Sequence, residues 1–209
     1  MSEGTVGVVD YGMGNLLSVC HAVERAGGKF HICRTPEELE NMERFILPGV
    51  GAFGDCMRNL KERGLIDALH GLVIGQKLPI LGICLGMQVM ARRGFEGGER
   101  LGLGWFEADV VRLTPDDPSL RVPQIGWNDV TFRMASELSN GLPERPDFYF
   151  VHSYCMRCDK PDEVLATCDY GGAVTAAVGR DNIIATQFHP EKSQDYGLRV
   201  IENFLSWRP

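Results

Sequence analysis

The sequence lacks three features that would place it in large classes of protein. No run of basic residues is longer than two, and 21 Lys and Arg against 28 Asp and Glu give a net charge of −7, so a nucleic-acid footprint is missing. The longest nearly apolar run, Leu78 to Ala91, contains Pro79 and Gln88 and is shorter than the roughly 18 residues of a membrane span. The first residues show no basic segment followed by an apolar stretch. We therefore expect a cytoplasmic protein with no nucleic-acid or membrane partner.

A disulfide framework is also missing. The seven cysteines are odd in number and scattered through a chain too long to need covalent stapling, which favours reduced thiols. Glycine, by contrast, is abundant, with 25 of 209 residues, and glycine permits positive φ and close backbone approach. With 44% apolar and 23% charged residues, the composition indicates a single domain over residues 1–209, rich in functional turns.

The first half alternates short β-branched runs with helical patterns. This βαβ order implies a mostly parallel central sheet flanked by helices, the architecture of an α/β protein. The predicted strands are Thr5–Val9, Lys29–Cys33, Phe45–Leu47 and Pro79–Ile83. The predicted helices are Asn15–Ala26, Asp55–Glu62, Leu65–Ile74 and Leu85–Arg93.

The second half contains short strand patterns separated by Gly, Pro and Asp clusters, with little helix between them. This arrangement predicts an antiparallel extension of the sheet in the C-terminal half. The predicted strands are Trp105–Leu113, Phe148–Tyr154, Val164–Cys168, Ala173–Val178 and Ile183–Phe188, and a final helix is predicted over Gly197–Trp207.

A candidate nucleophile lies between a strand pattern and a helix pattern, in Gly82-Ile83-Cys84-Leu85-Gly86. Small residues flank a nucleophile on such a tight strand-to-helix turn, which holds the side chain at the carboxyl end of the sheet. The N–H groups and dipole at the start of the following helix would stabilise a Cys84 thiolate, and the Leu85 N–H could donate to an oxyanion. Taken alone, the pattern also fits a structural cysteine in a glycine-flanked turn.

A thiolate that attacks a carbonyl carbon needs a proton carrier beside it, a role suited to imidazole. His189 ends a predicted strand and is followed by Pro190 and Glu191. In extended backbone, residues two apart face the same way, so Glu191 can approach the His189 ring and fix its tautomer. The alternative is a turn after a strand with an incidental His and Glu. Cys84 and His189 can meet where parallel strands end at one edge of the sheet.

Two further patterns suggest cofactors but are incomplete. Gly12-Met13-Gly14 follows the first predicted strand, but Leu17 stands where a dinucleotide-binding motif requires glycine. His152, Cys155 and Cys158 could begin a zinc site, yet no second pair with suitable spacing follows. We expect neither a metal nor any other cofactor.

Gly82–Gln88 and His189–Glu191 together resemble the class I, triad-type glutamine amidotransferases. Further stretches, spread from residue 10 to residue 193, resemble the glutaminase subunits of this family that serve a cyclase in histidine biosynthesis. These stretches are Asp10–Leu16, Leu47–Phe53, Gly126–Asn128, Tyr149–Tyr154 and His189–Ser193.

The resemblance implies a reaction and a role for each matching residue. Cys84 would attack the side-chain amide of glutamine to form a thioester, His189 would protonate the departing ammonia and later deprotonate water, and Glu191 would orient His189. The implied oxyanion strand consists of Pro48, Gly49, Val50 and Gly51, although Pro-Gly is also a common strand-ending turn. The implied glutamine-binding residues are Gly51, Leu85, Gln88, Glu96, Ser153 and Tyr154.

Two of these binding residues can also be judged from the sequence itself. Gln88 lies one helical turn from Cys84, so the i, i+4 spacing aims it at the same cleft. Glu96 fits a solvated carboxylate at a helix end equally well.

The resemblance also implies a partner. The chain is too short to add an acceptor site, and free ammonia would be lost to solvent, so we expect a heterodimer with a (β/α)8-barrel cyclase subunit that makes imidazole glycerol phosphate and aminoimidazole carboxamide ribotide. Gln124 departs from the family, which commonly has His at this position. The alternatives are a paralogous glutaminase that serves another synthase and a catalytically silent regulatory subunit.

Overall fold

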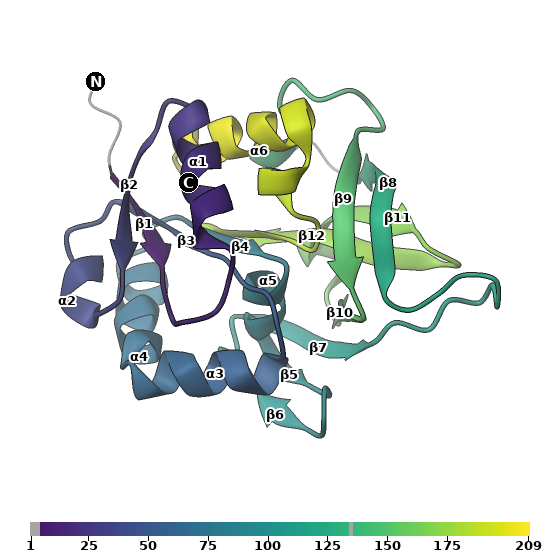
Figure 1. The fold of residues 1–209 in the computed structure, drawn as a ribbon, viewed down its shortest axis with the longest axis horizontal. Coiled ribbons are helices and arrows are strands. Elements are labelled where there is room, and N and C mark those ends of the chain that lie inside the picture. Colours follow the sequence, from purple (N-terminus) through teal and green to yellow (C-terminus); the bar gives the residue numbers. More distant parts are fainter. Residues whose placement is uncertain (1–4, 134–135) are drawn as a thin grey trace.

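The centre of the molecule is a nine-stranded sheet with the order β2-β1-β3-β4-β13-β12-β11-β8-β9 (Figure 1). The computed structural model describes residues 5–133 and 136–209. The first five strands in this order are mutually parallel and mostly apolar, as expected where helices cover both faces. They are β2 (Lys29–Cys33), β1 (Thr5–Val9), β3 (Arg44–Leu47), β4 (Ile80–Ile83) and β13 (Ile183–Thr186).

The remaining four strands of this sheet pair antiparallel. They are β12 (Ala173–Arg180), β11 (Val164–Asp169), β8 (Gln124–Phe132) and β9 (Asp147–His152). The prediction of a parallel sheet with an antiparallel extension is therefore confirmed. β8 was not predicted, because its sequence lacks a regular alternation of apolar and polar residues and contains Gly126, whose φ is +127°.

Helices cover both faces of the parallel strands and divide the core in two (Figure 1). On one face, α1 (Leu16–Arg25) and α6 (Gln194–Ser206) pack their apolar sides on β1, β3 and β4. On the other face lie α2 (Pro36–Leu39), α3 (Phe53–Glu62) and α4 (Leu65–Leu69), which continues as a π-helical turn over His70–Gly75. Among the helices that the structure describes, none has the length and apolarity to cross a membrane.

A second, four-stranded sheet was not foreseen. Its order is β10-β7-β5-β6, formed by Tyr154–Cys158, Phe106–Arg112, Ala91–Gly94 and Arg100–Leu101. The helix predicted over Leu85–Arg93 is wrong in its second half, because α5 covers only Leu85–Val89. The backbone N–H groups of residues 103–105 donate to the carbonyls of residues 89–91, and these tertiary hydrogen bonds replace the next helical turn.

The strand predicted over Phe148–Tyr154 is divided at Ser153. Its first part is β9 of the large sheet, and its continuation is β10 of the small sheet. The chain therefore passes from one sheet to the other at Ser153, beside the carboxyl ends of β4 and β13. This edge holds the candidate site.

Candidate active site

Cys84 stands on a strained turn between β4 and α5. Its φ of 52° and ψ of −105° are unusual for a residue other than glycine. The Cys84 N–H donates to the Thr186 carbonyl oxygen at 2.7 Å, which ties the turn to β13. A Cβ at Gly86 would overlap the Leu47 carbonyl oxygen, so only glycine fits after the turn. The tight elbow predicted from the glycine spacing is present.

His189 and Glu191 form a buried pair just beyond β13. His189 Nδ1 lies 2.7 Å from Glu191 Oε1, and the two side chains are 1% and 3% exposed. A carboxylate oxygen accepts the proton of this bond, so Nδ1 donates and Nε2 is left to exchange protons. Among the described residues, His189 Nε2 has no hydrogen-bond partner.

The charge state of His189 follows from its neighbours. Burial lowers the pKa of His189, but the interaction with the neighbouring Cys84 and the hydrogen bond and Coulombic attraction to Glu191 outweigh burial and raise this pKa to about 9. No direct Nε2–Sγ hydrogen bond is formed within the described part of the chain, so we attribute the Cys84 contribution to proximity. At neutral pH the site therefore favours an imidazolium beside the sulfur, the arrangement a cysteine nucleophile needs.

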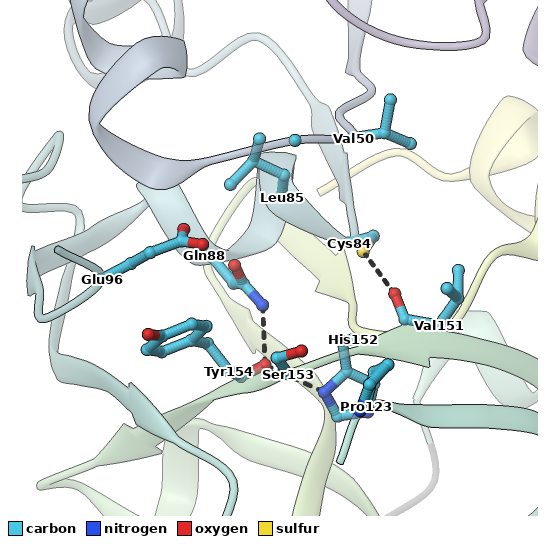
Figure 2. A pocket seen from close by; sticks show the side chains of 11 residues that line it. Val50, Cys84, Leu85, Gln88, Glu96, Pro123, Val151, His152, Ser153 and Tyr154 are labelled. Carbon is cyan, nitrogen blue, oxygen red and sulfur yellow. Dashed lines mark hydrogen bonds between the residues drawn. The ribbon is translucent and has the colours of Figure 1, made fainter.

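A cavity of about 280 Å³ opens beside Cys84 (Figure 2). All six residues predicted to hold glutamine line it, and Val50, Pro123, Val151 and His152 complete the wall. The volume lies near the lower end of ligand pockets, roughly 300 Å³, so it suits a small molecule such as one amino acid. The cavity and the Cys84 elbow thus share one location.

The predicted oxyanion strand runs from β3 to α3 along one side of this cavity. Val50 and Gly51 face the cavity, whereas Pro48 and Gly49 are not among its lining residues. A Cβ at Gly49 would lie 2.8 Å from Leu85 Cβ, so the strand passes directly over the start of α5. The first N–H groups of α5 have no acceptor within the helix, and they lie beside the strand as a source of oxyanion donors.

Glu96 does not stand at a helix end of its own, as the alternative interpretation supposed. It lies between β5 and β6, and its carboxylate accepts the Phe53 N–H at 2.8 Å, at the start of α3. The side chain also borders the cavity (Figure 2). Glu96 therefore links the small sheet to the helix that follows the oxyanion strand.

A hydrogen-bonded chain that the sequence analysis missed connects the cavity wall to the nucleophile. Gln88 Nε2 donates to the Tyr154 carbonyl oxygen at 2.8 Å and to Gln187 Oε1 at 3.1 Å. Gln187 Nε2 in turn lies 3.6 Å from Cys84 Sγ. Gln187 lies two residues before His189, so alternation along the predicted strand Ile183–Phe188 could have placed the two side chains on the same side.

His152 and Gln124 lie beneath the same wall. His152 Nδ1 donates to the Tyr154 carbonyl oxygen at 2.9 Å, and Nε2 lies 3.0 Å from the Gln124 side-chain amide. Burial lowers the pKa of His152 to about 4, so the ring is neutral at pH 7 and Nε2 accepts, which requires the amide to turn its NH2 group toward the ring. Gln124, the residue that departs from the family, is thus a buried support of the cavity wall.

The possible zinc pattern that begins at His152 is not assembled. Both ring nitrogens are occupied by the contacts to Tyr154 and Gln124. Nowhere in residues 5–133 and 136–209 do three or more His, Cys, Asp or Glu side chains gather as a metal site would require.

The family described as "Glutamine amidotransferase class-I" matches residues 7–207. The chain is 48% identical to the imidazole glycerol phosphate synthase subunit HisH of Mesorhizobium japonicum, over 98% of this chain and 99% of the relative. It is 46% identical to HisH 1 of Campylobacter jejuni strain RM1221, over 96% and 98%. PurLQS from Thermotoga maritima shares the fold, with a TM-score of 0.76, 17% identity and coverage of 97% and 98%.

Proposed function

Since the chain belongs to the class-I glutamine amidotransferases, and among them to the HisH subunits of imidazole glycerol phosphate synthase, we propose that it releases ammonia from glutamine for that synthase. One observation carries the proposal at the level of chemistry. The Cys84 elbow opens on a cavity of amino-acid size, and the buried His189–Glu191 pair lies close enough to Cys84 to interact with it. Nucleophile, proton carrier and orienting carboxylate are the set that amide hydrolysis through a thioester requires.

The reaction proceeds in two halves. The Cys84 thiolate attacks the side-chain carbonyl carbon of glutamine, and the oxyanion is stabilised by N–H groups of α5 and of the strand 48–51. The C–N bond breaks as His189 gives its Nε2 proton to the nitrogen, which leaves ammonia and a thioester. His189 then takes a proton from water, and the hydroxide attacks the thioester. This attack expels the Cys84 thiolate and leaves a γ-carboxylic acid, which ionises to glutamate and releases its proton to solvent. His189 is again protonated, and one water is consumed per glutamine.

The cavity wall offers complementary groups for the rest of the substrate. Glu96 supplies a carboxylate for the α-ammonium group, and the backbone at Ser153 and Tyr154 receives the α-carboxylate. The Gln88 amide donates one N–H to the Tyr154 carbonyl oxygen (Figure 2). It donates the other to Gln187 Oε1, which leaves Gln88 Oε1 to accept from the substrate carboxamide.

The proposed partner is a cyclase subunit with a (β/α)8-barrel fold, bound as a heterodimer in the cytoplasm. The name of the relatives marks them as subunits, and this chain carries exposed apolar side chains close to the site. Ile125 and Trp127 on β8 are 62% and 46% exposed. The Trp127 ring packs edge-on against the Tyr149 ring, with 6.1 Å between the ring centroids. The Tyr149 carbonyl oxygen accepts the backbone N–H of His189. An apolar surface next to the proton carrier is suited to a partner that receives the ammonia.

The test is glutamate release, measured with and without the cyclase subunit and its ribotide. We expect a low rate alone and a high rate in the complex, and no release from Cys84→Ser in either case. Labelling of Cys84 by a glutamine-derived electrophile separates an enzyme from a silent subunit, because a silent subunit would form no adduct. A pull-down that recovers another synthase instead of the cyclase would point to the paralogous glutaminase.

A further inference from the structure

The orientation of the Gln187 amide is fixed by its neighbours. The Tyr154 carbonyl oxygen can only accept, so the Gln88 group 2.8 Å away must be its NH2. That NH2 also faces Gln187 at 3.1 Å, so the Gln187 atom there must be the oxygen. The remaining end of the Gln187 amide is therefore its NH2, which lies 3.6 Å from Cys84 Sγ. Gln187 is completely buried, so water does not compete for this contact.

Cys84 Sγ has a different neighbour on another side. It lies 3.9 Å from the Val151 carbonyl oxygen, which can accept the proton of the thiol but can give nothing to a thiolate (Figure 2). The Gln187 N–H, in contrast, is a donor and interacts more strongly with a negatively charged sulfur. The two contacts therefore favour opposite states of the nucleophile.

We propose that Gln187 is a further catalytic residue of this glutaminase, whose side-chain N–H donates to the Cys84 thiolate before attack and again when the thioester breaks. This inference rests on the proposed glutaminase function. The other end of the same amide, Gln187 Oε1, accepts from Gln88 and holds Gln88 at the cavity wall. One buried side chain thus joins the nucleophile to a substrate-binding residue.

Several titratable groups surround the sulfur and must be separated from Gln187 in any pH experiment. His189 and Glu191 follow β13, His152 comes from β9, and Tyr11 comes from the loop after β1. Gln187 itself carries no charge. Its replacement by an apolar residue therefore leaves every titrating group in place and removes only the amide hydrogen bonds.

The test is the alkylation rate of Cys84 by iodoacetamide between about pH 5 and pH 10, followed by mass spectrometry of the Cys84 peptide. We expect Gln187→Met, which keeps the length of the side chain, to raise the pH midpoint by about one unit, equivalent to a roughly tenfold smaller thiolate fraction below it. Gln187→Glu keeps the acceptor for Gln88 but places a negative charge beside the sulfur, so its midpoint should rise further.

The matched control is Asn203→Leu, which removes another buried side-chain amide. Asn203 lies on α6, and its amide donates to the carbonyl oxygens of Leu138 and Asn140. This variant should lower stability without moving the midpoint. Wild-type midpoints in both folded Gln187 variants would overturn the inference. If the variants do not fold, the wild-type protein decides: alkylation of Cys84 should shift the NMR signal of the Gln187 side-chain amide, and an unmoved signal would also overturn it.

Failure of this inference differs from failure of the proposed function. A wild-type protein that releases glutamate and is labelled at Cys84, together with variants that keep the wild-type midpoint, contradicts the role of Gln187 alone. A wild-type protein that shows neither glutamate release with the cyclase nor labelling contradicts the glutaminase and, with it, the role of Gln187.

Discussion

The buried hydroxyl of Tyr11 donates to the Pro48 carbonyl oxygen at 2.9 Å. Burial raises the pKa of Tyr11 well above its ordinary value, so the hydroxyl remains a donor at every working pH. This bond holds the peptide at the beginning of the oxyanion strand. The strand lies so close to Tyr11 that a Cβ at Gly49 would be 2.6 Å from the same hydroxyl. Glu96 holds the other end through the Phe53 N–H. The oxyanion strand is thereby anchored at both ends.

Removal of the Tyr11 hydroxyl tests this arrangement. Tyr11→Phe leaves the Pro48 carbonyl oxygen unpaired, and we expect a loss of about 1–3 kcal/mol in the free energy of unfolding together with a lower kcat. Denaturant unfolding and steady-state glutamate release measure the two effects. Tyr170→Phe is the matched control, because Tyr170 also donates to a carbonyl, that of Arg121, but at an exposed site. Equal effects of the two variants would contradict a special role for Tyr11.

The His189–Glu191 pair predicts a pH dependence. In the wild-type protein, His189 stays protonated until the pH approaches about 9. Glu191→Gln removes the carboxylate that helps to hold this proton, so the alkaline limb of the kcat/KM profile should move to lower pH. We expect kcat to fall by roughly 10²–10⁴-fold. Asp195→Asn, an exposed change in the first turn of α6, should leave the profile unchanged.

His152 predicts a loss of stability in acid. Its pKa is lowered to about 4 in the folded protein, against an ordinary value of about 6.5, so the unfolded chain binds the proton more readily. The stabilisation is complete above about pH 6.5 and is lost as the pH falls toward 4, by up to about 3 kcal/mol. Unfolding of His152→Gln, measured from pH 7 downward, should show a flatter acid limb than the wild type. His21→Gln, on the exposed side of α1, should keep the wild-type slope.

The elbow predicts a strict requirement for glycine. Gly86→Ala would drive a methyl group into the Leu47 carbonyl oxygen, and we expect a loss of more than about 3 kcal/mol or a failure to fold. Gly75→Ala is the control, because a Cβ at Gly75 meets nothing within 4 Å. Thermal unfolding should show a near-neutral change at Gly75. A well-folded, active Gly86→Ala protein would contradict the packing described for α5.

Local rules could predict those parts of the site that depend on close neighbours in the sequence. The elbow follows from the glycines on either side of Cys84. Glu191 does approach His189, but the expected extended backbone is wrong, because Pro190–Lys192 form a 3-10 turn that begins at His189. The small sheet could not be predicted in this way, because residues 91–93 are Ala-Arg-Arg, which are good helix formers and extend the helical pattern of the residues before them. Tertiary hydrogen bonds from residues 103–105 decide between the two structures. Alternation places Gln187 on the same side as His189, but the side-chain contacts of Gln187, to Cys84 at the start of α5 and to Gln88 within it, are set only by the fold.

The Tyr154 carbonyl oxygen has a wider consequence, because it accepts from both Gln88 and His152. Flipping the Gln88 amide, or moving the proton of His152 from Nδ1 to Nε2, would leave a buried group without its hydrogen-bond partner. The orientation of Gln187 is fixed in turn through Gln88. The dipoles around the cavity are therefore aligned as the protein folds, before any glutamine arrives. Such preorganisation spares the reaction the reorganisation energy that water would demand at each change of charge.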